Sequence, residues 1–211
     1  MKKNKLLLHK QILAAVLSGG ILLLPNWGYA LPQGGQVVAG TGSIGTPGGD
    51  QMNITGSGNV AIDWNSFNVA QGESVKFSGM QAVLNYVTGN TKSEIFGNIS
   101  GSGVHVFLVN PNGILFGATA SVNVGELTAS TRTIDNRKSF DGTAFSTLSP
   151  EAAQKVRGDI INLGELTADK ILLEGDNISL LNAHMLKSSG NGNITMRADN
   201  KVTVGYEVTD K

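Results

Sequence analysis

The chain has 211 residues, with 16 basic and 16 acidic side chains, no cysteine and 6% aromatic residues. The lack of cysteine excludes a disulfide-stabilised fold, and the balanced charge excludes the basic footprint that phosphate binding requires. The apolar stretch at residues 11–24 is shorter than the roughly 20 residues of a membrane-spanning helix. We therefore expect no nucleic-acid partner, and no integral membrane span in the mature chain.

Residues 1–30 have the pattern of a secretory signal peptide. Four lysines precede the apolar stretch, Pro25 follows it, and small residues occupy positions 28 and 30. This pattern predicts export by the Sec machinery and cleavage between Ala30 and Leu31, with a membrane anchor as the alternative. Cleavage would leave 12 basic and 16 acidic residues, so the mature chain would be mildly acidic.

Short β-strands are predicted along the mature chain, residues 31–211. Alternating runs of four to six residues are bounded by Gly, Asn, Asp or Ser, which is typical of strands and turns. One short helix is expected at residues 150–156, inside a polar excursion from the main body around residues 131–157. The clearest strand candidates are residues 60–64, 74–77, 104–109, 193–197 and 201–204.

An internal repeat favours a solenoid. Residues 122–130 match residues 161–169 at an offset of 39 positions, and a period of this size is typical of stacked repeats. The offset corresponds either to two coils of roughly 20 residues or to one coil plus the excursion. We predict an all-β fold, a right-handed parallel β-helix with Gly or Asn at its corners. A β-sandwich would explain the strands and turns but not the repeat.

Both ends of a solenoid need protection from solvent and from edge pairing. Residues 31–40 are predicted to form an N-terminal cap. Residues 202–206 lead to Lys211 with no obvious cap. We therefore expect the chain to be the N-terminal piece of a longer solenoid, or a truncated relative of one.

The most distinctive stretch, residues 106–117, places an Asn-Pro-Asn-Gly turn between two apolar strands. Pro111 fixes φ near −65°, and Asn112 or Gly113 can adopt the left-handed conformation that such a turn needs. A tight turn at a solenoid corner is predicted. The residues alone leave open whether the turn is also a recognition feature.

Six motifs in a fixed order give the chain a resemblance to a known family. It resembles the N-terminal secretion domain of filamentous haemagglutinin-type exoproteins of the two-partner secretion pathway. Two departures are visible: Tyr86 stands where many members have Arg, and a second motif of the Asn-Pro-Asn-Leu type has no clear match. After the signal peptide, the motifs lie at residues 31–35, 64–69, 83–89, 95–99, 109–117 and 122–125.

The resemblance implies a parallel β-helix with an N-terminal cap and extra-helical antiparallel strands. It implies a monomeric export domain, recognised by an outer-membrane β-barrel transporter with periplasmic POTRA domains. The cargo would be a Gram-negative exoprotein of the adhesin, haemagglutinin, haemolysin or contact-dependent toxin type, delivered to the cell surface or the medium. The recognition residues implied are Asn85, Asn110, Pro111, Asn112, Gly113 and Ile114.

A physical route to such recognition is strand addition, in which an extended segment pairs with an exposed sheet edge. A chain kept unfolded in the periplasm would offer its amphipathic strands to a POTRA domain in this way. We expect residues 104–117 to be part of what the transporter recognises.

No catalytic, cofactor or metal site is predicted. His105 and His184 lack a partner pattern for a metal, and His105 is expected on the solvated outer face of a strand. Parallel β-helices include polysaccharide lyases and hydrolases, so a carbohydrate-active enzyme is one alternative, and a directly carbohydrate-binding adhesin is another. An enzyme would need clustered charge, and we interpret the one candidate cluster as a charged excursion loop. Its residues are Arg132, Arg137, Lys138, Arg157 and Asp159.

Overall fold

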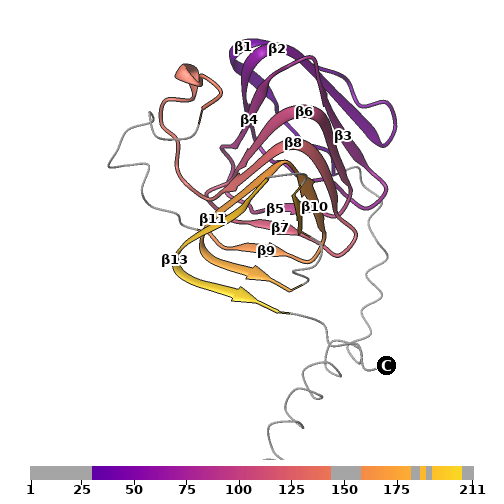
Figure 1. The fold of residues 1–211 in the computed structure, drawn as a ribbon. Helices are drawn as coiled ribbons and strands as arrows, with labels where there is room; N and C mark the ends of the chain where they lie inside the picture. The colour runs from indigo at the N-terminus through magenta and orange to yellow at the C-terminus, as the bar shows by residue number, and fades with distance from the viewer. Residues whose placement is uncertain (1–29, 144–157, 182–185, 189–191, 206–211) are drawn as a thin grey trace, which may run out of the picture.

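The computed structural model describes residues 30–143, 158–181, 186–188 and 192–205. Thirteen strands in these ranges form one continuous sheet that coils into a β-helix (Figure 1). The single helical element in the same ranges is a 3₁₀ turn, η1 (Arg137–Ser139). The predicted signal peptide up to residue 29, the predicted helix at 150–156 and His184 lie outside the described residues.

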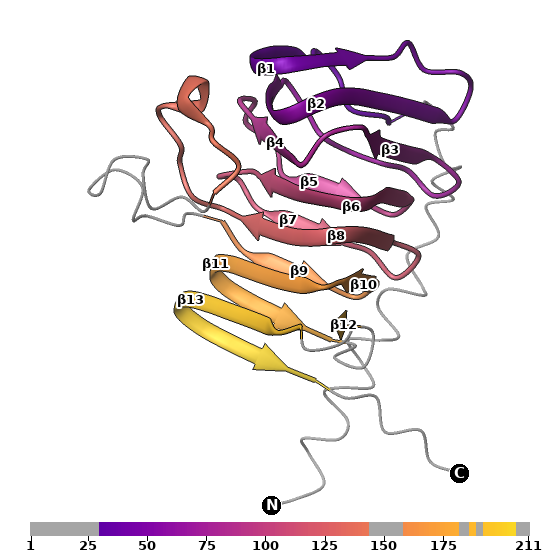
Figure 2. The ribbon, with the colours of Figure 1, turned by 45° about the horizontal axis from the view of Figure 1, so that its top comes forward.

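Each coil has three faces, here named A, B and C. Figure 2 shows the coils stacked along one axis. Face A contains β3 (Ser74–Ser78), β10 (Glu165–Ala168), β12 (Leu186–Ser188) and the first parts of β2 (Gln51–Trp64), β6 (Asn98–Val109) and β8 (Ser121–Ser130). Face B contains the second parts of β2, β6 and β8, with β4 (Ala82–Val87) and the first parts of β11 (Lys170–Leu180) and β13 (Ile194–Val204). Face C contains β5 (Ser93–Ile95), β7 (Ile114–Phe116), β9 (Ile160–Asn162) and the ends of β11 and β13.

Parallel pairing between successive coils confirms the predicted β-helix. On face B, Val83 lies opposite Val60 on one side and opposite Val106 on the other, at intervals of 23 residues. Because side chains alternate along a strand, such a register stacks inward-facing residues above one another. The interior is therefore a continuous apolar column, in which the largest fully buried side chains include Trp64 and Phe116.

The internal repeat predicted the fold but gave the wrong register. Val122 lies opposite Leu166, and the matching residue of the repeat, Ile161, lies opposite Leu115 instead. Leu127 faces Ile171, which follows it by 44 positions. The 44 positions between these stacked residues therefore correspond to one coil plus the excursion. The two repeat segments, at an offset of 39, are not structural equivalents. The similar sequences reflect a shared pattern of short strands and glycine corners.

The two ends of the coil differ in the described residues. At the first end, β1 (Gln36–Ile44) pairs antiparallel with β2, and the side chain of Leu31 is fully buried in the core. This is the predicted cap, extended beyond residue 40. At the other end, β13 pairs with β11 alone, and Val202 and Val204 are 41% and 42% exposed.

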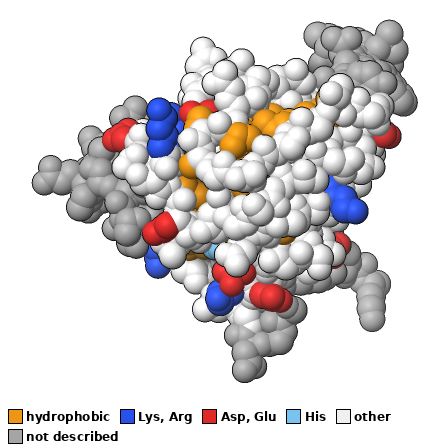
Figure 3. Space-filling model, turned by 90° about the horizontal axis from the view of Figure 1, so that it is seen from above, with side chains coloured by type: hydrophobic (Ala, Val, Ile, Leu, Met, Phe, Trp, Pro, Cys, Tyr) orange, Lys and Arg blue, Asp and Glu red, His pale blue; other side chains and the backbone are white. Residues whose placement is uncertain are grey.

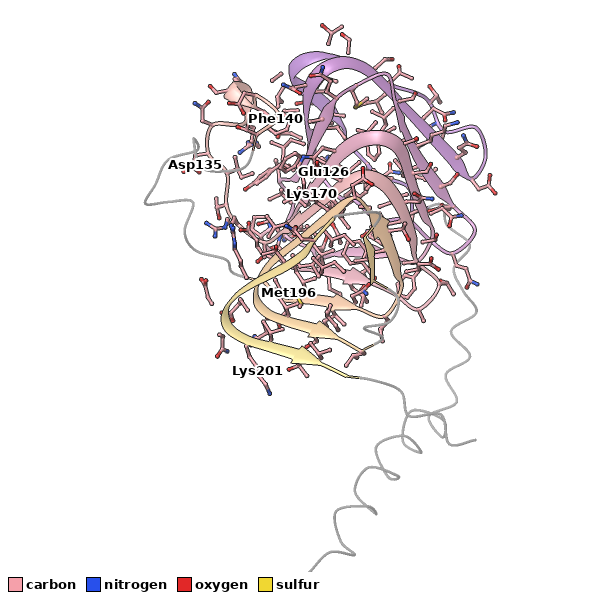
Figure 4. All side chains as sticks on the ribbon, in the orientation of Figure 1. Glu126, Asp135, Phe140, Lys170, Met196 and Lys201 are labelled. Atoms are coloured by element: carbon pink, nitrogen blue, oxygen red, sulfur yellow. The ribbon has the colours of Figure 1, made fainter. Side chains whose placement is uncertain are left out.

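A second apolar cluster covers the outside of face B, and two residues of the predicted excursion belong to it. Ile134 is fully buried and Phe140 is 9% exposed, although both belong to the excursion. The ring of Phe140 meets that of Phe107 edge to face, with centroids 5.3 Å apart, and Figure 4 shows Phe140 directed at the coil. The described part of the excursion therefore closes over the coil.

Arg137 fixes the excursion to the coil. Its Nε and Nη2 donate to the two carboxylate oxygens of Asp63 at 2.7 and 3.1 Å, a bidentate geometry that is among the strongest for an ion pair. The guanidinium carbon lies 4.3 Å from the ring centroid of Tyr86, in a cation–π arrangement. Tyr86 is buried, and burial raises the pKa of its phenol. Tyr86, the departure from the family pattern, is therefore an anchor for the excursion.

Replacing Phe140 by Ala should destabilise the domain by about 3 kcal/mol, because it removes most of the ring that covers Phe107. Urea unfolding of residues 31–211 would measure the loss. Phe96→Ala is the matched control, since Phe96 is 37% exposed and its removal should cost clearly less. Equal losses for the two variants would contradict a packing role for the excursion.

Candidate functional site

The candidate site is the corner at which face B turns into face C between β6 and β7. The amide of Gly113 donates to the carbonyl of Asn110 at 3.0 Å, which closes a four-residue turn. Gly113 has φ of +113°, a value that favours glycine. The predicted tight turn at a solenoid corner is therefore present.

Asn110 is the central residue of the corner and is 1% exposed. Its Nδ2 donates to the carbonyl of Thr91 and to Oγ of Ser93, both at 3.0 Å. Its Oδ1 accepts the backbone N–H of Asn112 at 2.9 Å. One side-chain amide thus stabilises its own turn and also connects it to the corner of the preceding coil.

The other motif residues divide into an exposed and a buried pair. Pro111 is half-exposed and Asn112 is exposed, whereas Gly113 and Ile114 are buried. Asn112 Nδ2 donates to the carbonyl of Gly89 at 2.8 Å and to Oδ1 of Asn110 at 3.0 Å. The structure therefore brings residues 110–114 together as one corner, of which the folded surface presents only the tip.

Asn85, the remaining recognition candidate, is buried in the interior of face B rather than in the turn. Its Oδ1 accepts Nε1–H of Trp64 at 3.1 Å, and its Nδ2 donates to the carbonyl of Phe107 at 3.2 Å. These bonds satisfy a polar group inside an apolar column, which would otherwise cost free energy. In the folded domain Asn85 therefore connects Trp64 to the backbone of Phe107 inside the packed core.

The predicted cleavage site lies at the beginning of the described residues. Leu31 is fully buried, while Ala30 is half-buried. The backbone N–H of Ala30 donates to Oε1 of Glu73 at 2.8 Å. Glu73 was not among the residues that the sequence pattern indicated, because its partner is 43 positions away in the chain.

Corners from several coils lie together beside the motif, an arrangement that sequence reasoning missed. The excursion leaves the coil at this corner one coil after the motif, where Thr131 Oγ1 donates to the carbonyl of Gly158 at 3.0 Å. Asn177 Nδ2 donates to Oδ1 of Asp159 at 2.8 Å. A hollow of about 450 Å³ lies over these corners, lined by polar residues that include Lys92, Asn112, Asp159, Asp176 and Asn177.

His105 lies on the outer face of β6 as predicted, but it is not simply solvated. Its ring stacks on Phe107 with centroids 3.9 Å apart, and its Nε2 lies 2.9 Å from Oγ1 of Thr128. Burial is the largest influence and lowers the pKa of the imidazole, against the smaller opposing effect of Glu126. Glu126 in turn accepts a bond from Lys170 at 2.9 Å, and Figure 4 shows these two side chains together.

The charged residues considered for an enzyme do not gather around one groove in the described ranges. Arg132 lies 3.1 Å from the carboxylate of Glu174, and Arg137 binds Asp63 instead. Arg157 is outside the described residues. On the face that Figure 3 shows from above, Lys, Arg, Asp and Glu side chains lie at several separate places.

The described residues offer neither a metal centre nor a membrane-spanning helix. They contain no group of three or more metal-ligating side chains that could hold an ion. They also contain no helix that is long and apolar enough to cross a membrane.

Comparison with known proteins supplies a context for the corner around Asn110. The family model of the TPS secretion domain matches residues 30–208. The crystal structure of the HMW1 secretion domain from Haemophilus influenzae is similar with a TM-score of 0.53 and 31% sequence identity, over 74% of this chain and 44% of that chain.

Two curated relatives are heme/hemopexin-binding proteins from Haemophilus influenzae. One, from strain Rd, is 29% identical over 191 residues, which are 84% of this chain and 21% of that protein. The other is 36% identical over 108 residues, which are 49% of this chain and 12% of that protein. The chain thus spans about a fifth or less of the length of these relatives.

The half-buried imidazole of His105 makes stability depend on pH. The pKa of His105 is lower in the folded chain than its ordinary value of 6.5, so the unfolded chain binds the proton more tightly. Stability should therefore fall as pH falls through about 6.5 and level off below the folded pKa. Urea unfolding of wild type and His105→Gln between pH 7.5 and 5 would isolate this contribution. Parallel pH profiles for the two proteins would contradict it.

Proposed function

The chain belongs to the TPS secretion domain family, and from this premise we propose that residues 31–211 are the export address of a larger exoprotein. A signal peptide at residues 1–30 would bring the chain to the periplasm. An outer-membrane transporter with POTRA domains would then recognise it and pass it to the cell surface or the medium. The observation that carries this proposal is the Asn110 corner, at the position of the family's secretion motif.

Burial of Asn110 argues that the transporter recognises the chain before it folds. The side chain is 1% exposed in the folded domain, so a partner could not contact it there. Strand β6, which ends at the motif, is paired on both sides, with β3 and β4 on one and β8 on the other. It has no free edge for strand addition. The Asn110 side chain and the edges of β6 become available to a partner only in the unfolded chain.

The turn itself is suited to recognition in an open chain because its bonds are local. The bond from Asn112 N–H to Asn110 Oδ1 spans two residues, and the bond that closes the turn spans three. Pro111 fixes one φ angle without any tertiary contact. These elements do not depend on stacking, so a partner would meet a preformed bend between two extended apolar segments.

The curated relatives suggest the kind of cargo. Their names describe binding of heme and hemopexin, and their matched segment is about a fifth or less of their length. We infer that this chain also addresses a surface exoprotein, and that ligand binding belongs to chain beyond the secretion domain. This role requires no catalysis by residues 31–211, whereas a carbohydrate-active enzyme or a directly binding adhesin would require a groove in the coil.

Asn110→Ile should abolish secretion by a co-expressed transporter and leave signal cleavage intact, because it removes the amide that forms the turn. Asn162→Ile is the matched control. Asn162 is also fully buried, and its amide bonds with the backbone of Gly164 at 3.1 and 3.3 Å. Immunoblots of medium and periplasm would compare the two. We expect Asn162→Ile to reach the medium and Asn110→Ile to remain in the periplasm.

Two results would count against this interpretation. Wild-type amounts of Asn110→Ile in the medium would limit Asn110 to a structural role. Equal loss of both variants would indicate that export depends on folding rather than on recognition of the motif.

Direct binding offers an independent test of the order of events. Isolated POTRA domains should bind residues 31–211 freshly diluted from urea and should bind the prefolded domain at least about tenfold more weakly. Surface plasmon resonance or pull-down of the two forms would measure the difference. Equal affinity for both would mean that the transporter contacts residues exposed in the fold, such as Asn112.

A further inference from the structure

A buried carboxylate receives the N-terminal end of the described chain. Glu73 is 5% exposed and lies at the corner between face C and face A. Its Oε1 accepts the N–H of Ala30 at 2.8 Å, and its Oε2 accepts the N–H of Ala70 at 2.7 Å. Within the described ranges, no Lys or Arg forms an ion pair with it. A carboxylate this deeply buried normally requires a cation or several hydrogen-bond donors.

The backbone around Glu73 holds this carboxylate in a fixed place. The N–H of Glu73 donates to the carbonyl of Ala70 at 3.0 Å, and its carbonyl accepts the N–H of Asn98 in the next coil at 2.9 Å. The carboxylate therefore belongs to a rigid corner, and does not depend on a free loop for its position.

The next residue of the N-terminal segment is also held in place. Leu31 is fully buried in the core, and its carbonyl accepts Nε2–H of Gln33 at 2.7 Å. The N–H of Gln33 donates to the carbonyl of Ser66 at 2.9 Å. Any charge created on the nitrogen of Leu31 would therefore lie next to the interior, within one residue of the Glu73 carboxylate.

We propose that Glu73 binds the α-ammonium group that signal cleavage creates on Leu31, so that maturation completes the N-terminal cap. Hydrolysis of the Ala30–Leu31 bond consumes one water and leaves a carboxylate on Ala30 and an ammonium on Leu31. The N–H of Ala30 leaves with the signal peptide, and the new ammonium replaces it as the donor to Oε1. The proposal rests on the predicted cleavage site, and it goes beyond the export role.

The exchange strengthens the contact. Before cleavage, the Glu73 carboxylate accepts from a neutral amide, whereas afterwards donor and acceptor carry opposite charges, so their Coulombic attraction adds to the hydrogen bond. Because Leu31 begins the segment that leads into β1, the stronger contact would fix the cap strand on the first coil. The precursor, which retains residues 1–30, would have a less firmly held cap.

The first test measures the α-amine of purified mature residues 31–211. Its pKa follows from the pH dependence of acylation of the N-terminal peptide, read by mass spectrometry. We expect a pKa about one unit or more above the ordinary value near 8, and acylation at pH 7 at least about tenfold slower than in urea. Glu73→Gln, which keeps an oxygen acceptor, should return both values to those of a free peptide. The matched control Glu94→Gln, at an exposed carboxylate, should not.

A second measurement leaves Glu73 in place and does not depend on the folding of a variant. Nα-acetylation of the wild-type chain removes the charge, so its urea midpoint should be lower than that of the free-amine chain at pH 7. The difference should disappear as pH rises through the folded pKa of the amine, because a raised pKa contributes stability only while the group is protonated.

The outcomes separate the premise from the proposal. The mass of the exported chain shows whether it begins at Leu31. Another first residue would contradict only the predicted cleavage site and would leave the export role intact. If the chain begins at Leu31, an α-amine that reacts in the folded domain as fast as in urea would overturn the proposal. Equal urea midpoints for the acetylated and free chains would overturn it as well.

Discussion

Every coil of this domain depends on its neighbours for backbone hydrogen bonds. Parallel strands pair only between coils, so the ladder stops at each corner, where N–H and carbonyl groups need other partners. Asn110 and Asn162 supply them at the ends of face B and face C, in each case through a buried side-chain amide. The motif therefore has a structural role first, because Asn110 provides hydrogen-bond partners for backbone groups at a corner. Any role in recognition is added to a residue that the fold already requires.

Face B carries apolar side chains on both of its sides. Its inner side forms the core column, and its outer side carries Phe107 and Tyr86 under the excursion. The excursion leaves the coil at the corner that follows the motif by one coil, and returns to the coil at Gly158. One edge of the coil thus holds both the candidate signal and the segment that covers the second apolar cluster. Changes at this edge are expected to affect both.

Local features were predictable from the sequence, and distant ones were not. The turn at Pro111 and Gly113 could be predicted because its geometry depends on four consecutive residues. The register could not, because an inserted excursion changes the spacing between stacked strands without changing the pattern within them. The partial burial of His105 depends on its contacts with Phe107 and Thr128. Its neighbour Thr128 is contributed by another coil, which alternation along a single strand does not reveal.

The almost complete burial of Asn110 has a consequence for the direction of transport. If the open chain is the form that a transporter recognises, folding conceals the recognised group inside the molecule. The domain would then be a single-use recognition signal. A transporter could bind it on the side of the membrane where the chain is unfolded, but not on the side where the chain has folded. Such a signal prevents a delivered molecule from competing with new cargo for the transporter. It would require no further signal to end recognition, because folding itself ends it.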